Sequence, residues 1–282
     1  MSAPVRAVPV FSVDVEDWFQ VSAFERVVER TRWDSYESRV VRNTSMLLES
    51  MARANAFGTF FTLGWVAERF PGLVRSIVDA GHEIASHGYW HQRIPTIAES
   101  DFRADVHRAK AVLEDVSGAR VIGYRAPSFS LTDDVPWAMR ILVEEGYEYD
   151  SSRFPISRRG YGAANALREP HLLYTSAGPL REYPPAVWPV AGVRVPVAGG
   201  GWFRQLPLGI IQRGLDAVLR EGIPAVFYIH PWEIDPDQPR LSVPLLTRIR
   251  HYRGLDRASQ RLSTLLARYR FQSFAQLEAV SA

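Results

Sequence analysis

Two histidines stand four residues apart in this chain, at His87 and His91, directly after the short apolar run 83–85. This spacing predicts a helical turn that places both imidazoles on one face, where they could bind one metal ion. The chain contains no cysteine, so any further ligand must be a carboxylate or another histidine. Such a donor set fits zinc, iron, cobalt or manganese and does not choose among them. Zinc is the ion that we expect, with nickel as a further possibility.

Three acidic residues, Asp14, Glu16 and Asp17, follow an apolar run near the N-terminus. A solvated turn is the ordinary explanation of such a cluster. Here, however, Val13 and Val15 alternate with the acids, which favours a strand. If the strand continues through Glu16, then Asp14 and Glu16 share one face and Asp17 points the other way. Two histidines and one carboxylate would leave a coordination position open for water, as in catalytic metal sites.

Two more candidates follow apolar runs farther along the chain. Arg125 lies in Gly-Tyr-Arg-Ala-Pro, and His230 lies in Ile-His-Pro. Singly, Arg125 could form a surface ion pair and His230 could be a capping or core residue. Together with the acids and the histidine pair, they lie where a barrel concentrates its catalytic groups, at strand ends.

Short apolar runs alternate with amphipathic ones, which predicts an α/β fold built around parallel strands. The expected strands are 8–13, 58–62, 83–86, 123–125, 147–149 and 225–229. The expected helices are 39–54, 73–80, 101–116, 135–145, 208–220 and 245–268, the last interrupted at Gly254. A barrel-like ring of strands accounts for this alternation.

We expect a single domain over residues 1–282, with an insertion at 155–207 and a C-terminal helical extension at 234–282. The insertion is rich in glycine, proline and aromatic residues, which predicts loops and short edge strands rather than helices. Within it, the run Gly199–Gly201 lacks the spacing of a phosphate-binding motif, so we expect a tight turn beside the site.

The composition is that of an ordinary globular protein, with 46% hydrophobic and 23% charged residues. A formal net charge of +2 does not favour nucleic acid as a partner. No secretory leader and no run long enough to span a membrane is evident, so a cytoplasmic location is expected. The oligomeric state is left open.

The order of these motifs resembles the polysaccharide deacetylase family, carbohydrate esterase family four, from about Val10 to Pro231. The segments 199–204 and 231–253 resemble the subgroup found with bacterial exosortase and exopolysaccharide loci. The resemblance implies a distorted (β/α) barrel, here expected to be seven-stranded. It also implies metal-dependent removal of N- or O-acetyl groups from sugars.

Residues that match the family's motifs take on its roles by this resemblance. Asp14 matches the general base, and His230 matches the general acid. Arg125 matches the arginine that holds the base. Asp150 matches the acid that orients the catalytic histidine.

His87 and His91 match the family's metal ligands, but the surrounding motifs depart from its pattern at two points. The family commonly has adjacent aspartates, whereas Val15 occupies the second place here, so Glu16 is the expected ligand and Asp17 the alternative. Gly88 stands where serine or threonine is usual. A supporting hydrogen bond to the metal loop is therefore expected to be missing.

Several bulky side chains beside the motifs suit the apolar faces of sugars, although core packing is the ordinary role of large aromatics. The expected groove residues are Trp18, Trp90, Pro127, Phe129, Trp202 and Trp232, and Tyr89 is a further aromatic beside the motifs. About two or three of the aromatics should line the groove.

The expected function is a metal-dependent deacetylase that acts on an acetylated glycan, with N-acetyl groups favoured. The glycan would be a bacterial polysaccharide or its biosynthetic intermediate. Two alternatives remain, an amide or cyclic-imide hydrolase of the same fold and a non-catalytic glycan-binding protein. A base and an acid in one chain argue against the second alternative.

Overall fold

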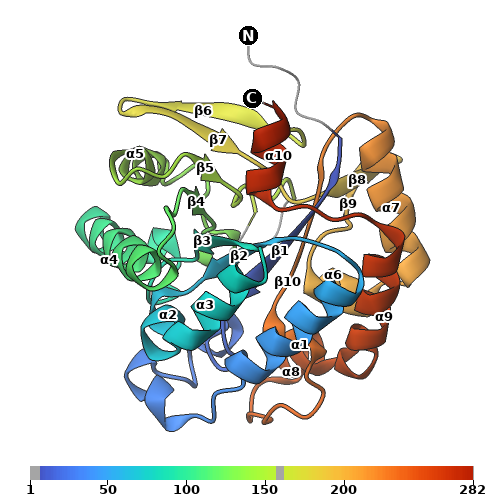
Figure 1. Ribbon diagram of the computed structural model, residues 1–282, viewed down its shortest axis with the longest axis horizontal. Coiled ribbons are helices and arrows are strands. Elements are labelled where there is room, and N and C mark those ends of the chain that lie inside the picture. The colour runs from blue at the N-terminus through green and yellow to red at the C-terminus, as the bar shows by residue number, and fades with distance from the viewer. Residues whose placement is uncertain (1–6, 157–161, 282) are drawn as a thin grey trace.

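A curled eight-stranded sheet forms the centre of the computed structural model, which describes residues 7–156 and 162–281 (Figure 1). Its strands are β1 (Pro9–Val15), β2 (Thr59–Thr62), β3 (Glu83–Ser86), β4 (Gly123–Tyr124), β5 (Tyr149–Asp150), β6 (His171–Thr175), β7 (Gly178–Glu182) and β10 (Ala225–Ile229). The order across the sheet is β10-β1-β2-β3-β4-β5-β7-β6. A separate antiparallel pair consists of β8 (Val187–Val190) and β9 (Val193–Pro196).

The distorted (β/α) barrel expected from the sequence is confirmed, with one strand more than predicted. Seven strands, from β10 to β7, pair in parallel, and β6 adds an antiparallel edge strand. This edge strand forms because β6 and β7 are two halves of a hairpin. Beyond β7, the amide of Ala186 donates to the carbonyl of Val226 at 3.0 Å, so the chain meets β10 and the sheet curls toward closure.

Helices surround the sheet, and most of them cover its outer face (Figure 1). They are α1 (Val40–Arg53), α2 (Gly64–Arg69), α3 (Pro71–Asp79), α4 (Glu99–Ser117), α5 (Pro136–Glu144), α6 (Gly200–Gln205), α7 (Leu208–Arg220), α8 (Leu245–Tyr252), α9 (Leu255–Arg268) and α10 (Phe274–Ser281). The buried side chains of α4 recur every three or four residues, as a helix with one apolar face requires. Gly254, at φ +79°, separates α8 from α9 where the sequence predicts an interruption. No helix among the described residues has the length and apolar character needed to cross a membrane.

The segment 155–207 contains more regular structure than its composition predicts. The expectation of loops and edge strands was wrong for β7, which is a member of the parallel sheet, and for α6, which begins at Gly200. Glycines weaken the helix signal of α6. Tertiary contacts offset this, because Arg261 donates to the carbonyls of Phe203, Arg204 and Leu206 at the end of α6.

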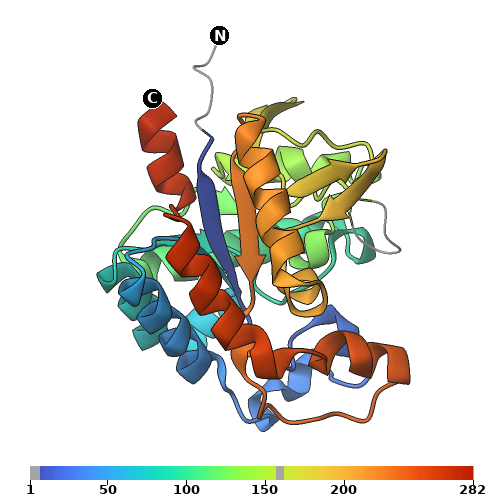
Figure 2. The same ribbon diagram turned by 90° about the vertical axis from the view of Figure 1, so that its right-hand side faces the viewer.

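The inside of the barrel changes character along β1. Val10, Ser12 and Asp14 share one strand face, so the interior is apolar at the start of β1 and polar at its end. Helix α10 closes the apolar end, near the start of β1 (Figure 2), where Phe274 and Leu277 pack against buried side chains of the strands. The polar end is left for chemistry.

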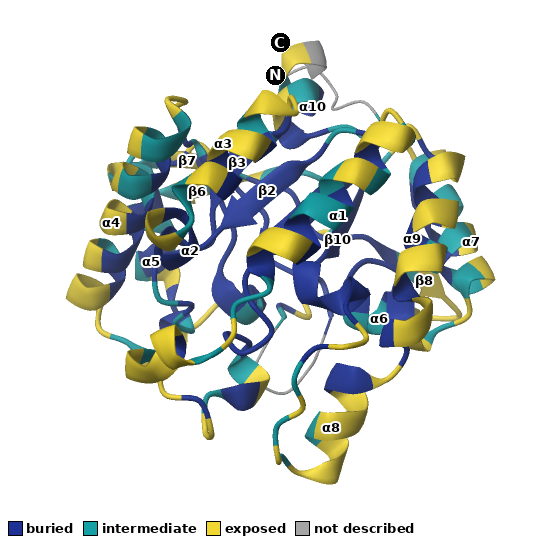
Figure 3. Cartoon of the chain, turned by 60° about the horizontal axis from the view of Figure 1, so that its bottom comes forward, coloured by how far each residue is buried: buried dark blue, intermediate teal, exposed yellow. Residues whose placement is uncertain are grey.

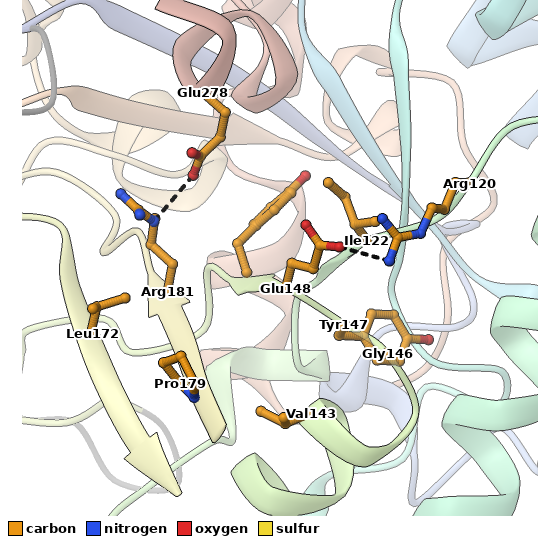
Figure 4. Close-up of a pocket in the computed structure, with 11 residues that line it drawn as sticks. Arg120, Ile122, Val143, Gly146, Tyr147, Glu148, Leu172, Pro179, Arg181 and Glu278 are labelled. Carbon is orange, nitrogen blue, oxygen red and sulfur yellow. Dashed lines mark ion pairs between the residues drawn. The ribbon is translucent and has the colours of Figure 1, made fainter. Parts of the chain in front are cut away.

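A cavity of about 490 Å³ lies near the starts of β4 and β5 (Figure 4). Its charged side chains are paired, Arg181 with Glu278 at 3.4 Å and Arg120 with Glu148 at 2.7 Å. This pairing suits a structural role at the closed end of the barrel.

Candidate active site and metal centre

The predicted catalytic and metal-binding residues lie at or near the carboxyl ends of the parallel strands, Asp150 at the end of β5. Asp14 lies one residue before the end of β1, His87 follows β3, Arg125 follows β4 and His230 follows β10. Neighbouring parallel strands end at one edge, so residues far apart in sequence come together there. A cavity of about 510 Å³ opens among them and is lined by Asp14, Glu16, His87, His91 and His230, among others.

Glu16, His87 and His91 form a group that could hold a metal ion. One ligand atom from each lies within 4.8 Å of the others, and all three residues are buried. Nδ1 of His87 donates to the carbonyl of Arg125 at 2.8 Å, which leaves Nε2 unprotonated and without a hydrogen-bond partner among the described residues. Such a tautomer, held by a second group, is what a metal ligand needs. The donor set therefore fits a divalent ion.

Electrostatics keep Glu16 and His87 in the protonation states that bind a metal. Burial alone would raise the pKa of Glu16, but the neighbouring imidazoles, His91 first, outweigh it and lower the pKa to about 2. Burial lowers the pKa of His87 to about 4, so this imidazole stays neutral at pH 7. Ionised carboxylate and neutral imidazole are the forms that bind metals. Trp232 Nε1 donates to Oε1 of Glu16 at 3.2 Å and orients that carboxylate.

Asp17, the alternative carboxylate ligand, is not part of this group, so the prediction of Asp17 as a ligand was wrong. Its carboxylate accepts hydrogen bonds from Ser38 Oγ at 2.6 Å and from the amides of Trp18, Arg39 and Val40. Asp17 thus satisfies amides at the start of α1, away from the histidines. Burial raises its pKa to about 6.

The histidine pair lies in a loop rather than in the predicted helical turn. Gly88 and His91 both have positive φ, of +74° and +51°, and this backbone path brings the two rings to 5.2 Å between centroids. The loop does have support, contrary to the expectation drawn from Gly88. Asp105 on α4 accepts hydrogen bonds from the amides of Tyr89 and Trp90 at 2.7 and 3.0 Å.

Gly88 is required because of this support. A Cβ at residue 88 would lie 2.8 Å from Oδ2 of Asp105, and the positive φ disfavours any other residue. On the other side of the loop, Arg30 donates to the carbonyls of Trp90 and His91 at 2.8 and 3.1 Å. The metal loop is therefore fixed from both sides.

Asp14 is held by Arg125 in a buried ion pair. Nη1 of Arg125 donates to Oδ1 of Asp14 at 2.7 Å and to Ser12 Oγ at 2.8 Å. Nε and Nη2 donate to the carbonyl and hydroxyl of Ser151, and the guanidinium lies 4.1 Å from the ring of Phe61. The second carboxylate oxygen, Oδ2, faces the cavity and lies 3.8 Å from Nε2 of His230.

His230 is oriented by Glu233, three residues later in the short turn η5 (Pro231–Ile234). Its Nδ1 donates to Oε2 of Glu233 at 3.0 Å, and Oε1 of Glu233 accepts from Nε of Arg204 at 2.8 Å. Burial would lower the pKa of His230, but Glu233 and then Glu16 and Asp14 raise it to about 9. Burial would raise the pKa of Glu233, yet Arg204 and His230 lower it to about 2. The pair is ionic at neutral pH.

Asp150 does not contact His230, so the expected orienting role was wrong. Its oxygens accept from the amide and hydroxyl of Ser152 at 3.0 and 2.5 Å, and its carboxyl pairs with Glu182. Burial raises the pKa of both carboxyls, and for Glu182 the charge of Asp150 adds to the effect. The amide of Ala126 donates to Ser152 Oγ at 2.7 Å, so Asp150 braces the residues beside Arg125.

Glu233 and Arg204 are site residues that the sequence reasoning missed. Two sequence features could have pointed to them. Glu233 follows His230 by three residues, and a run of glycines stands just before Arg204. A Cβ at Gly200 would lie 1.4 Å from Oε2 of Glu233, and one at Gly199 would lie 2.4 Å from the ring of Tyr228. The glycines thus make room for the groups that surround His230.

Of the six expected groove residues, Phe129, Trp202 and Trp232 line the cavity. The prediction of Trp18 as a groove residue was wrong, because this side chain is buried and its Nε1 donates to the carbonyl of Glu37 at 3.0 Å. Trp90 packs against the core, and neither it nor Pro127 lines the cavity. The position of an aromatic residue beside a motif in the sequence does not show whether its side chain points into the cavity or into the core.

Comparison with known proteins divides the chain near residue 150. Residues 29–149 match the family described as polysaccharide deacetylase, and residues 151–279 match a domain of unknown function, DUF3473. A peptidoglycan-N-acetylglucosamine deacetylase from Bacillus cereus is 34% identical over 86 residues, which cover 30% of this chain and 29% of that protein. A chitooligosaccharide deacetylase from Sinorhizobium fredii is 32% identical over 93 residues, or 33% of this chain and 43% of that protein. The matches thus span less than half the length of these curated relatives.

The fold likeness extends over nearly the whole chain. A crystal structure from Mycobacterium smegmatis, named as a candidate polysaccharide deacetylase, covers 98% of this chain and 91% of its own with a TM-score of 0.64 at 22% identity. The first family match contains His87, His91 and Arg125, and the second contains His230 and Glu233. Residues 29–149 are thus similar to the polysaccharide deacetylase family, and the likeness to the Mycobacterium smegmatis structure shows that the same fold extends over nearly the whole chain.

Proposed function

We propose that this chain is a metal-dependent deacetylase that removes N-acetyl groups from a bacterial polysaccharide or from its biosynthetic intermediate. One observation carries the proposal. A single cavity holds a candidate metal triad, a carboxylate fixed by an arginine and an imidazole fixed by a second carboxylate. Hydrolysis of an acetamide needs an activated water, a base for its proton and an acid for the departing nitrogen.

Asp14 is the proposed base. Its Oδ1 is held by Arg125, so the carboxylate cannot rotate away, while Oδ2 is turned toward the cavity. Oδ2 would take a proton from water as the water oxygen bonds to the acetyl carbon. A divalent ion bound by Glu16, His87 and His91 would polarise the acetyl carbonyl and acidify the water.

His230 is the proposed acid. Because Nδ1 donates to Glu233, the proton that can leave is the one on Nε2, which lies 3.6 Å from Oε1 of Glu16 and 3.8 Å from Oδ2 of Asp14. Nε2 would deliver this proton to the amide nitrogen as the carbon–nitrogen bond breaks. The products are acetate and a free amine on the sugar.

Several observations support a glycan as the substrate. Phe129, Trp202 and Trp232 offer flat apolar rings around the cavity, and the named relatives act on peptidoglycan or chitooligosaccharide. Zinc is the proposed ion, since two histidines and one carboxylate with an open position are typical of catalytic zinc. We also propose that the chain is a member of the subgroup found with bacterial exosortase and exopolysaccharide loci. The cytoplasmic location stays a prediction.

The test is acetate release from a panel of N-acetylated oligosaccharides. Protein stripped of metal and reloaded with zinc, cobalt, manganese, iron or nickel should release acetate, and His87→Ala protein should not. Asp14→Asn protein should bind metal normally and still fail to release acetate. Full activity of Asp14→Asn would contradict the proposed base, and cleavage of cyclic imides without acetate release would favour the alternative hydrolase.

A further inference from the structure

Helix α8 exposes its apolar side chains to solvent. Leu245, Leu246 and Ile249 are 59%, 68% and 40% exposed, whereas His251 and Tyr252 are buried against the body of the protein. At 100° per residue, the three exposed side chains occupy a sector of about 100°. Figure 3 shows α8 at the lower edge of the molecule with its exposed surface turned outward.

Arginines border this apolar sector. Arg248 and Arg250 lie on its two sides along the helix, and Arg240 and Arg253 lie just before and just after it; all four are exposed. The sequence has no acidic residue from 238 to 255, and among the described residues none of the four has a carboxylate within ion-pair distance. An apolar strip flanked by unpaired positive charge is the pattern of a helix that lies in a membrane interface.

We propose that α8 binds the surface of a membrane that contains anionic lipids, with the three apolar side chains inserted between head groups and the arginines paired with lipid phosphates. The charges select this occupant. A second copy of the chain, docked on the same face, would bring like-charged arginines together across a two-fold interface. An uncharged partner would leave them unpaired, whereas anionic head groups satisfy them.

Helix α8 is also attached to the candidate active site. Arg204, which holds Glu233, donates to the carbonyls of Arg250, His251 and Arg253 at 3.2, 2.8 and 2.6 Å. The ring of His251 stacks on Trp232 at 4.2 Å between centroids, and Arg250 lines the cavity. Figure 2 shows α8 projecting from the end of the molecule to which the strands β1 and β10 point.

Membrane binding by α8 would therefore hold the cavity beside the lipid surface. Access to substrate would then favour a glycan that is linked to lipid or lies against the membrane. This consequence rests on the proposed function, but the membrane binding itself does not.

The test is sedimentation of the full chain with vesicles. Wild-type protein should bind vesicles of phosphatidylcholine mixed with phosphatidylglycerol, should bind phosphatidylcholine vesicles weakly, and should be released by salt. A variant with Leu245→Gln, Leu246→Gln and Ile249→Gln should bind at least about tenfold more weakly. Arg248→Gln should weaken binding about fivefold.

A matched control removes exposed apolar side chains elsewhere, with Leu172→Gln, Tyr174→Gln and Val193→Gln on β6 and β9. This control should bind vesicles as the wild type does. Both triple variants should release acetate from a soluble oligosaccharide at the wild-type rate, so loss of vesicle binding is separable from failure of the proposed chemistry. Failure of the wild-type protein to sediment with anionic vesicles would overturn the proposal. The proposal would also be overturned if the triple variant in α8 bound anionic vesicles as the wild type does. It would be overturned as well if the only change in that variant were from dimer to monomer, measured by light scattering.

Discussion

Gly200 and Gly201 are neighbours in α6 for which the structure predicts opposite effects of the same substitution. A Cβ at Gly200 would lie 1.4 Å from Oε2 and 2.0 Å from Cδ of Glu233. Glu233 cannot yield without cost, because its oxygens are bonded to Arg204 and His230. A Cβ at Gly201 would meet nothing within 4 Å. Gly200→Ala should therefore expel Glu233, and Gly201→Ala should be accommodated.

The expected magnitudes follow from these contacts. Overlap in a packed region costs about 1–3 kcal/mol, so Gly200→Ala should lower the free energy of unfolding by at least this much. Gly201→Ala should change it by less than about 1 kcal/mol and in the stabilising direction, because alanine is the better helix former. If His230 is the proton donor, losing its carboxylate partner should lower the kcat of Gly200→Ala about 100-fold, with a much smaller change in KM.

Two assays on the same preparations check this reasoning. Urea unfolding gives the free energy, and acetate release gives kcat and KM. If Gly200→Ala matched Gly201→Ala in both assays, the close approach of Glu233 would be refuted. If Gly200→Ala lost stability but kept the wild-type kcat, the packing argument would stand and the role of Glu233 in catalysis would not.

Three further predictions concern charge and metal. Glu233→Gln removes the largest of the charges that raise the pKa of His230 to about 9, while burial, Glu16 and Asp14 remain, so the fall of kcat with rising pH should move from about pH 9 to lower pH; an unmoved pH profile would contradict it. His87→Ala should weaken zinc binding at least about tenfold in calorimetric titration, and wild-type affinity would exclude His87 as a ligand. Burial and Asp150 raise the pKa of Glu182, so the folded state keeps a proton that the unfolded chain releases, and the contribution of this group to wild-type stability should fall as the pH rises above 4.5. Glu182→Gln should lose less stability over this range in urea unfolding, and equal slopes for the two proteins would count against the shared proton.

The sequence predicted the barrel and the edge at which its chemistry lies. Apolar runs followed directly by Asp14, His87, Arg125 and His230 place these side chains at strand ends, and parallel strands end together. Local periodicity also located most of the helices and the break at Gly254. Each of these features depends on residues close together in the chain, which is why the pattern alone predicts them.

Only the tertiary structure decided which groups meet across the site. Asp17 and Glu16 are adjacent in sequence, but Asp17 accepts a hydrogen bond from the amide of Val40 at the start of α1, whereas Glu16 lines the cavity. The partner of His230 depended on a turn, η5, that directs Glu233 back to it, and on Arg204 from α6, whose helix the sequence did not predict. Such choices are made by hydrogen bonds and ion pairs between segments far apart in the chain. Their energies depend on distance and burial, which local residue patterns do not contain.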